Sequence, residues 1–162
     1  MEIVMGEEVQ KTRRPDLRFN ETEIKLLLSI MKNMEKPLEL MYYFLGKDSS
    51  KTFVMMLISA NEVNMEEVLI KEKRDTDILF TIDEDKNLFA LICQETKVDG
   101  AYRFAERILG TLVRQEAKDI YCIEIEVRST KYEVKDLIMK SIEKYIMAEK
   151  EKREREIIFH TL

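Results

Sequence analysis

The run TFVMMLIS, from Thr52 to Ser59, is the feature that most constrains how this chain can fold. It is almost uninterrupted in its apolar character, and its length suits a strand better than a helix. A strand that is apolar on both sides has to be covered on both faces, which requires a sheet that lies between layers of helices. We therefore expect a sheet flanked by helices.

The chain before this strand divides into an arm and a helix. Residues 1–19 are polar, contain Pro15 and show no sustained period, so we expect a flexible arm with a short strand over Glu2–Met5. A helix is predicted over residues 20–46, with Asn20 as its N-cap and Gly46 at its end. Pro37 either kinks this helix or begins a second one. The apolar residues at helical spacing are Ile24, Leu27, Leu28, Met31, Met34, Leu40, Met41 and Phe44.

The segments after the buried strand alternate between helical and strand patterns. A short helix is predicted over Asn64–Lys73, and the strands TDILFTI and NLFALIC follow, joined by the charged turn Asp83–Lys86. A helix over Asp99–Arg114 comes next, and its inner face carries Ala101, Phe104, Ala105, Ile108 and Leu112.

The last part of the chain contains two strand patterns around a helix. YCIEIEV alternates cleanly, which predicts a strand with Tyr121, Ile123, Ile125 and Val127 on the buried side and a wet opposite face. A final helix runs from Lys131 to about Lys152, and EIIFHTL is predicted to be an edge strand.

This order of elements predicts an α/β (α+β) fold. A mixed sheet of the ferredoxin-like or palm type is flanked by helices and carries an N-terminal helical extension. No internal repeat or low-complexity linker divides the 162 residues, so one domain is expected.

The charge and the cysteines limit the class of function. Charged residues make up 36% of the chain and the net charge is -5, which argues against general nucleic-acid binding but leaves room for a local anion site. Cys93 and Cys122 lie in apolar strands, where buried, reduced thiols are expected. No apolar run approaches the length of a membrane span, and we expect a cytoplasmic location.

Most catalytic constellations are absent from the sequence. His160 is the only histidine, there is no cluster of cysteines and histidines for a metal, and the four glycines are too scattered for a phosphate loop. No cofactor is therefore expected.

From about Thr52 to the C-terminus, the chain resembles a degenerate GGDEF (diguanylate cyclase) domain. RDTDILF is similar to that family's RxxD motif and the hairpin strand that follows it. LFALICQETKVDGAYRFAERI resembles the segment after the signature, and DLIMKSIEKYIMAEK resembles the final helix. The resemblance implies a degenerate GGDEF-like domain over residues 52–162.

The residues that the family uses for catalysis are replaced here. The signature turn reads DEDKN, whose carboxylates would repel a phosphate, and the metal-binding Asp-x-Asp position reads Ser59-Ala60-Asn61. A phosphate-binding lysine expected in the final helix corresponds to Glu149. The resemblance therefore implies a protein that is not a cyclase.

The family's inhibitory site for cyclic di-GMP corresponds to residues that this chain keeps. The resemblance places Arg74 and Asp77 at the RxxD motif and Arg107 at the arginine of the helix that follows. It implies a stacked dimer of cyclic di-GMP, with both arginines on guanine and phosphate and Asp77 on the guanine edge. Without a ligand, Arg74 and Asp77 would be a surface ion pair, and Arg107 would pair with a nearby carboxylate. Lys71, Lys73 and Arg103 flank this site, where each either helps to bind the ligand or, as is more usual for such residues, lies on a solvated face.

Two functions remain open at the level of the sequence. The first is a non-catalytic cyclic di-GMP receptor that signals to an unidentified protein partner. The second is a ligand-free scaffold that acts as a dimerisation or protein-docking module through helix 20–46, whose apolar residues occupy much of its circumference. That helix packs either on the sheet of its own chain or on another chain, which can be a second copy in a homodimer. A strand order other than the palm type would remove both interpretations.

Overall fold

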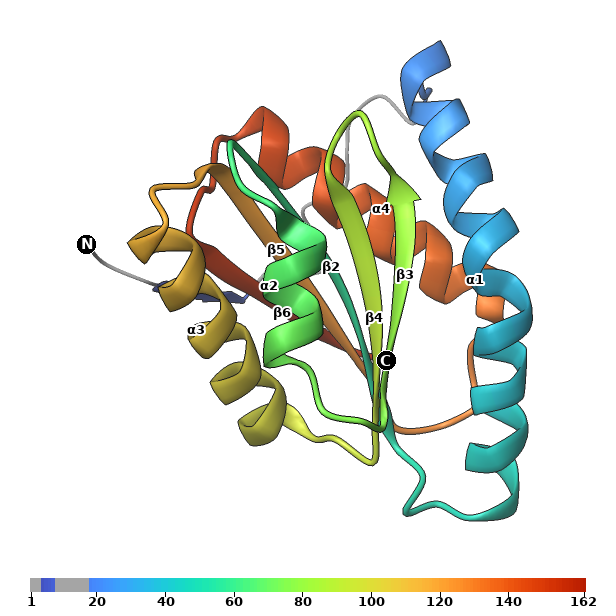
Figure 1. Cartoon of the computed structure of the whole chain (residues 1–162). Helices are drawn as coiled ribbons and strands as arrows, with labels where there is room; N and C mark the ends of the chain where they lie inside the picture. Colours follow the sequence, from blue (N-terminus) through green and yellow to red (C-terminus); the bar gives the residue numbers. More distant parts are fainter. Residues whose placement is uncertain (1–3, 8–17) are drawn as a thin grey trace.

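The sheet is built around the buried strand. The computed structural model describes residues 4–7 and 18–162. Its elements follow one another as β1 (Val4–Glu7), α1 (Glu21–Lys47), β2 (Phe53–Asn61), α2 (Met65–Glu72), β3 (Asp77–Asp83), β4 (Leu88–Gln94), α3 (Val98–Arg114), β5 (Lys118–Val127), α4 (Val134–Lys150) and β6 (Glu156–Thr161). They form a six-stranded sheet in the order β1-β6-β5-β2-β4-β3 (Figure 1).

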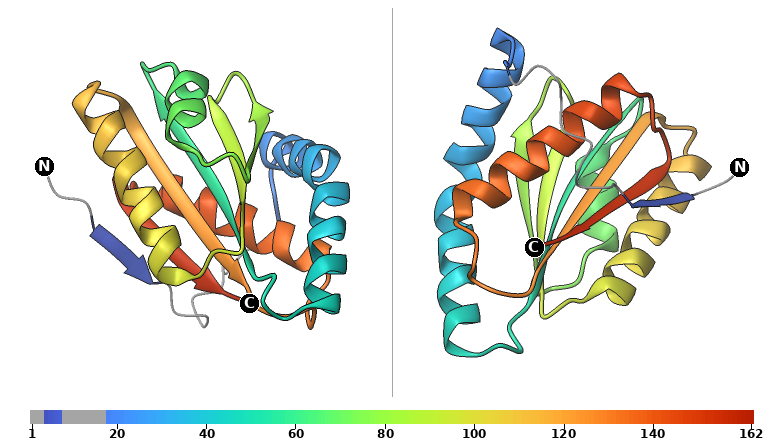
Figure 2. Two further views of the ribbon diagram at one scale, coloured as in Figure 1. Left: turned by 60° about the horizontal axis from the view of Figure 1, so that its bottom comes forward. Right: turned by 180° about the vertical axis from the view of Figure 1, so that it is seen from behind.

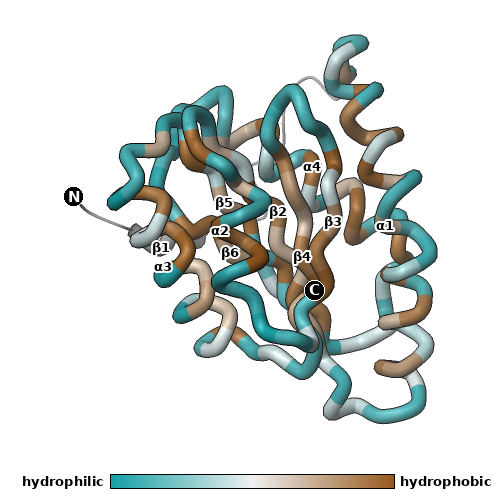
Figure 3. Tube along the Cα trace, in the orientation of Figure 1, coloured by the Kyte–Doolittle hydropathy of each residue, from teal (hydrophilic) through white to brown (hydrophobic). Residues whose placement is uncertain are grey.

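The strand β2 lies at the middle of the sheet and is covered on both faces. It pairs antiparallel with β4 on one side and β5 on the other. Helices α2 and α3 lie on one face, and α1 and α4 lie on the other (Figure 2). Every residue from Phe53 to Ala60 is buried. The predicted mixed sheet flanked by helices is therefore confirmed, and the strands that form its centre are among the most hydrophobic parts of the chain (Figure 3).

The two ends of the described chain meet at one edge of the sheet. β1 pairs in parallel with β6, so that Val4 lies opposite Glu156. The prediction that β6 is an edge strand was therefore wrong, because β1 occupies its outer side. The predicted strand Glu2–Met5 overlaps β1 at Val4 and Met5. Most of the predicted arm, residues 1–3 and 8–17, lies outside the described residues.

The N-terminal helix is a continuous part of the domain. Asn20 caps it as predicted: its side chain accepts from the Glu23 N–H at 2.8 Å, and the Glu23 carboxylate accepts from the Asn20 N–H at 2.9 Å. One helix runs through Pro37, so no second helix begins there. The N-terminal half of α1 also contacts the β3–β4 hairpin, since the Ser29 hydroxyl donates to the Ile82 carbonyl at 2.5 Å.

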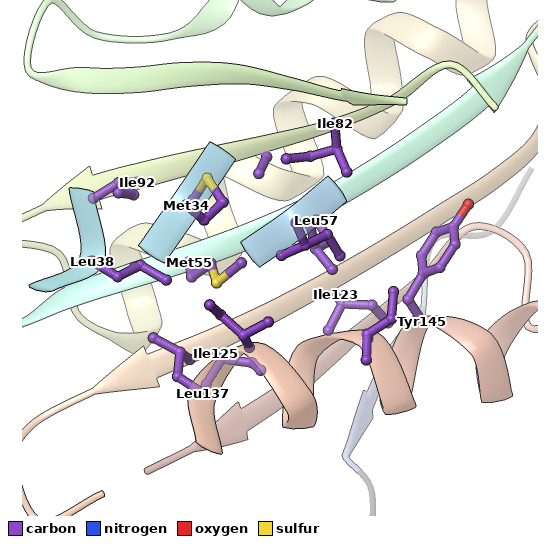
Figure 4. Packing of buried hydrophobic residues seen from close by; sticks show 14 of the residues in the cluster. Met34, Leu38, Met55, Leu57, Ile82, Ile92, Ile123, Ile125, Leu137 and Tyr145 are labelled. Carbon is purple, nitrogen blue, oxygen red and sulfur yellow. The ribbon is translucent and has the colours of Figure 1, made fainter. Parts of the chain in front are cut away.

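The inner face of α1 differs from the predicted one. Ile24 and Leu28 are 41% and 58% exposed. The helix is apolar on several sides, and the row that meets the sheet and α4 is spaced mainly by four residues. It consists of Leu26, Ile30, Met34, Leu38, Met41 and Leu45. Figure 4 shows two residues of this row, Met34 and Leu38, packed among residues of the sheet. The helix thus covers the sheet of its own chain.

The helix α3 follows the prediction closely. Ala101, Phe104, Ala105, Ile108 and Leu112 are all buried against the sheet. The prediction of a wet face on β5 was wrong, because α3 covers that face. Glu124 and Glu126 point to this side and are both 0% exposed.

The two buried glutamates of β5 have opposite environments. Glu126 accepts hydrogen bonds from the Val98 N–H at 2.9 Å and from Arg128 at 2.7 Å, and it thereby holds the start of α3. Neither carboxylate oxygen of Glu124 has a hydrogen-bond partner among the described residues. Burial raises the pKa of Glu124 well above its ordinary value.

No membrane-spanning helix is found in the part of the chain that the structure describes, since none is both long and apolar enough.

We predict that Met34→Ala lowers the free energy of unfolding by about 2–5 kcal/mol, because Met34 is completely buried between α1 and the sheet. Leu28→Ala on the exposed side of the same helix is the matched control and should change it by less than about 0.5 kcal/mol. Urea unfolding monitored by circular dichroism measures both. Equal effects of the two substitutions would contradict the placement of α1 in the core.

We predict that the free energy of unfolding of the Glu124→Gln protein increases relative to that of the native protein as the pH rises. The raised pKa means that the folded state keeps a proton that the unfolded state releases. The resulting contribution is fully present below the unfolded-state pKa and is lost as the pH rises through the folded-state pKa. Urea unfolding between about pH 4 and about pH 8 tests this. Glu126→Gln, which weakens real hydrogen bonds, should instead be destabilising at neutral pH; a pH-independent effect of Glu124→Gln would refute the assignment.

Candidate ligand-binding site

The RxxD motif lies at the junction between α2 and the edge strand β3. α2 ends at Glu72, and a turn closed by the hydrogen bond from the Asp77 N–H to the Arg74 carbonyl, at 3.0 Å, leads into β3. Asp77 is the first residue of β3 and pairs with Cys93 on β4. The hairpin thus fixes the motif against the end of the neighbouring strand.

Asp77 is fully engaged by Arg74. The side chain of Asp77 is 0% exposed, whereas that of Arg74 is 49% exposed. The carboxylate accepts from the Arg74 backbone N–H at 2.8 Å, from Nη2 at 2.7 Å and from Nε at 3.1 Å. The hydrogen bond to Asp77 raises the pKa of the Arg74 guanidinium above its ordinary value. Asp77 therefore holds Arg74 in one orientation.

Arg74 also ties the motif to the loop between β4 and α3. Its Nη2 donates to the Thr96 hydroxyl at 2.7 Å and to the Gln94 carbonyl at 3.2 Å. The Gln94 side-chain amide donates to the carbonyl of Thr76, which lies in the loop that carries Arg74, at 2.7 Å. The second terminal nitrogen, Nη1, has no hydrogen-bond partner among the described residues, so this edge of the guanidinium can still donate.

Arg107 reaches the same region from α3. Its Nε donates to Glu72 Oε2 and its Nη2 donates to the Glu72 carbonyl, both at 3.0 Å. The guanidinium also lies over the ring of Phe104, 5.3 Å from the ring centroid. Arg107 thus has the carboxylate partner that was expected in the absence of a ligand.

Arg74 and Arg107 line one pocket of about 230 Å³. Asp77 is not part of its lining, because Arg74 covers it. The lining residues are Arg74, Cys93, Thr96, Gly100, Arg103, Phe104 and Arg107. Three guanidinium groups around one hollow favour an anion, even though the whole chain is acidic.

Arg103 also lines this pocket, which agrees with the alternative that it helps at the site. It lies one helical turn before Arg107 on α3, and residues four apart share a face of a helix. It has no hydrogen bond or ion pair with any residue that the structure describes. The i, i+4 spacing to Arg107 was the signal in the sequence that could have identified it.

The thiol in the pocket wall is not suited to nucleophilic chemistry. Burial raises the pKa of Cys93 well above its ordinary value, and the negative charge of Asp77 adds to this effect. A thiol that stays protonated is a poor nucleophile. Cys122 is also free and buried. Neither cysteine is therefore a candidate nucleophile for this pocket.

The positions at which the sequence resemblance would place a metal site carry neutral groups with partners of their own. The Ser59 hydroxyl is 2.8 Å from the Tyr145 hydroxyl in the core. The Asn61 amide donates to Asp119 at 2.8 Å. Within residues 4–7 and 18–162, no group of three or more histidines, cysteines or carboxylates could hold a metal. The residues present do not fit a magnesium site.

The hairpin tip closes onto the end of β2. Asn87 has a φ of 52°, in the left-handed region that asparagine tolerates. Its amide donates to the Ala60 carbonyl at 2.7 Å and to the Val63 carbonyl at 3.1 Å. The neighbouring Lys86 lies 3.9 Å from Glu149 of α4. The predicted turn Asp83–Lys86 thus lies against the strand end and α4.

No protein-family model and no curated protein matches the sequence. Solved structures do match the fold. The diguanylate cyclase SiaD from Pseudomonas aeruginosa, in complex with its activator SiaC, matches with a TM-score of 0.57 and 13% identity over 77% of this chain. The chain spans only 57% of the length of that protein.

Two further structures match over most of their own length. The active GGEEF domain of a diguanylate cyclase from Vibrio cholerae has a TM-score of 0.56 and 11% identity, covering 73% of this chain and 88% of that one. The GGDEF domain of FimX from Pseudomonas aeruginosa has a TM-score of 0.54 and 11% identity, covering 76% of this chain and 91% of that one. Likeness at such low identity concerns the fold, and the fold of this chain is GGDEF-like.

Proposed function

We propose that this chain is a non-catalytic receptor for cyclic di-GMP. The observation that carries the proposal is the convergence of Arg74 and Arg107, from two separate elements, on one pocket that Arg103 also lines. The domain would act in the cytoplasm and pass the signal to a protein partner. SiaD, a protein of similar fold, was solved with an activator protein, which favours a protein partner here as well.

The chemistry of the pocket suits one end of the dinucleotide. A guanidinium edge can donate two hydrogen bonds to O6 and N7 of guanine, and the remaining cationic groups favour the phosphates. A pocket of about 230 Å³ is smaller than the 300–1,000 Å³ typical of sites that enclose a drug-sized ligand. We therefore place one guanine in the pocket and the rest of a stacked dimer across the surface beside it.

The role proposed for Asp77 differs from the expected contact with guanine. Its carboxylate is buried and already accepts from three groups of Arg74. Asp77 would therefore orient Arg74 while the free Nη1 edge of Arg74 meets the ligand.

Three features support the absence of cyclase activity. Neutral side chains occupy positions 59–61, where a metal would need carboxylates. The amide of Asn87 is committed to carbonyls at the end of β2. The turn beside it contains three acidic residues, Asp83, Glu84 and Asp85, and a negative turn would repel a triphosphate.

We predict that the purified protein binds cyclic di-GMP with a micromolar or lower Kd by isothermal titration calorimetry. Arg74→Ala and Arg107→Ala should each weaken binding by at least about tenfold, since each removes a charge-assisted hydrogen bond worth about 1.5–3 kcal/mol. Asp77→Ala should have a similar effect because it releases Arg74.

Matched controls on the same elements separate this effect from a general loss of charge. Arg114→Ala removes an exposed arginine from the end of α3, and Asp75→Ala removes an exposed carboxylate from the RxxD loop. Both should bind like the native protein. No heat from a folded native sample at high concentration would refute the receptor function.

The second candidate is a ligand-free docking or dimerisation module, and the outer side of α1 favours it. Large apolar side chains remain exposed there after the helix has covered its own sheet. They are Ile24, Leu28, Leu40, Tyr43 and Phe44, which are 40–60% exposed.

If α1 forms a dimer, Leu28→Lys and Tyr43→Lys should abolish a concentration-dependent increase in mass in sedimentation velocity experiments. Point substitutions are needed because α1 supplies core residues, and its deletion would unfold the domain. Lys36→Glu changes the charge of α1 without removing an apolar group and is the control. A monomer at every concentration would exclude self-association through this face.

A further inference from the structure

Glu72 binds one arginine of the pocket, Arg107, and lies two positions before the other, Arg74, in the sequence. It is the last residue of α2. Its side chain is only 17% exposed, although it lies near the surface. A carboxylate beside a pocket that favours anions is unexpected on charge alone, because it partly cancels the cationic field.

Both the side chain and the backbone of Glu72 bind α3. Oε2 accepts from Arg107 Nε at 3.0 Å, and the carbonyl oxygen accepts from Arg107 Nη2 at 3.0 Å. Oε1 accepts from the Thr111 hydroxyl at 3.2 Å. These three contacts fix the end of α2, and with it the loop that carries Arg74, against the helix that carries Arg107.

The contacts leave the other edge of Arg107 able to donate. Its Nε and one position on Nη2 are occupied, whereas Nη1 has no hydrogen-bond partner among the described residues. Asp77 binds Arg74 in the same way, because its carboxylate accepts from Nε and Nη2 and makes no hydrogen bond with Nη1. Each arginine is thus held from one side by a buried or mostly buried carboxylate.

We propose that Glu72 is a positioning residue of the binding site: it orients Arg107 and sets the spacing between Arg107 and Arg74. The inference rests on the proposed function, because it concerns the same pocket. A preorganised guanidinium loses less conformational freedom when a ligand binds, which increases affinity. Glu72 acts through Arg107 and need not touch the ligand.

The sign of the mutational effect separates positioning from charge. If Glu72 only lowers the local positive field, its removal should strengthen the binding of an anion. If it only holds α2 against α3, its removal should lower the free energy of unfolding and leave the affinity for the ligand unchanged. If it positions Arg107, its removal should weaken binding despite the gain in positive field.

The test is calorimetric titration of cyclic di-GMP into the full chain carrying Glu72→Ala or Glu72→Gln. We expect Glu72→Ala to weaken binding by about tenfold, a factor that corresponds to about 1.4 kcal/mol. Glu72→Gln should lose less, because its amide oxygen can still accept from Arg107 Nε. Glu66→Gln, on the exposed face of the same helix, removes the same charge and should bind like the native protein.

A double substitution shows whether the effect passes through Arg107. Glu72→Ala should cause no further loss of affinity when it is added to Arg107→Ala. Unchanged or stronger binding by Glu72→Ala alone would overturn the inference and leave the receptor function intact. The inference would also be overturned if Glu72→Ala weakened binding in the Arg107→Ala protein as much as it does in the native protein.

A measurement without ligand keeps the inference testable if the native protein does not bind cyclic di-GMP. The Nε–Hε signal of Arg107 in a 15N-resolved NMR spectrum should be protected from exchange with water in the native protein and lost in Glu72→Ala. This result would support the positioning of Arg107 for another anion, while the cyclic di-GMP proposal would fail. A signal that is equally protected in both proteins would overturn the role of Glu72.

Discussion

Burial of β2 on both faces is the constraint on which the rest of the structure depends. An apolar strand in this position needs a neighbour on each side and a layer of helices on each face. The hairpin β3–β4 and the strand β5 provide the neighbours, and the helix pairs α1–α4 and α2–α3 provide the layers. α2 and α3 share one face, and the end of α2 contacts α3, so that the loop that leaves α2 begins beside α3. The pocket follows from this arrangement.

The sequence predicts the order of the elements because local signals mark each boundary. Asn20 followed by Glu23 begins α1, and the inner residues of α3 have a clear helical period. The same local signals do not choose the inner face of α1, where apolar residues lie on several sides and the sheet selects the row that contains Ile30 and Met34. They also cannot reveal that α3 covers Glu124 on β5, because an alternating strand is consistent with a wet face until the helix above it is placed.

The sequence predicted which residues form the candidate site better than it predicted the role of each. Arg74 and Arg107 were expected from the resemblance, and both line the pocket. An ion pair between Arg74 and Asp77 was expected in the absence of a ligand, but the complete burial of the Asp77 side chain was not, because no local pattern specifies how deeply the first residue of β3 lies. Glu72 was not identified because its partner lies on a different helix, 35 residues along the chain. Such contacts appear only when α2 and α3 are packed together.

The pairing of β1 with β6 has a consequence for the order in which the sheet assembles. β6 is the only neighbour of β1 in the sheet, and the residues that pair, such as Val4 and Glu156, lie near opposite ends of the described chain. Strand β1 therefore has no edge to join until β5 and β6 are in place, and long-range contacts of this kind form slowly. During synthesis, β1 would be made before the other strands of this sheet and would be the last of them to find its position. It would also be the first to detach when the fold opens locally, which returns β6 to the edge of the sheet.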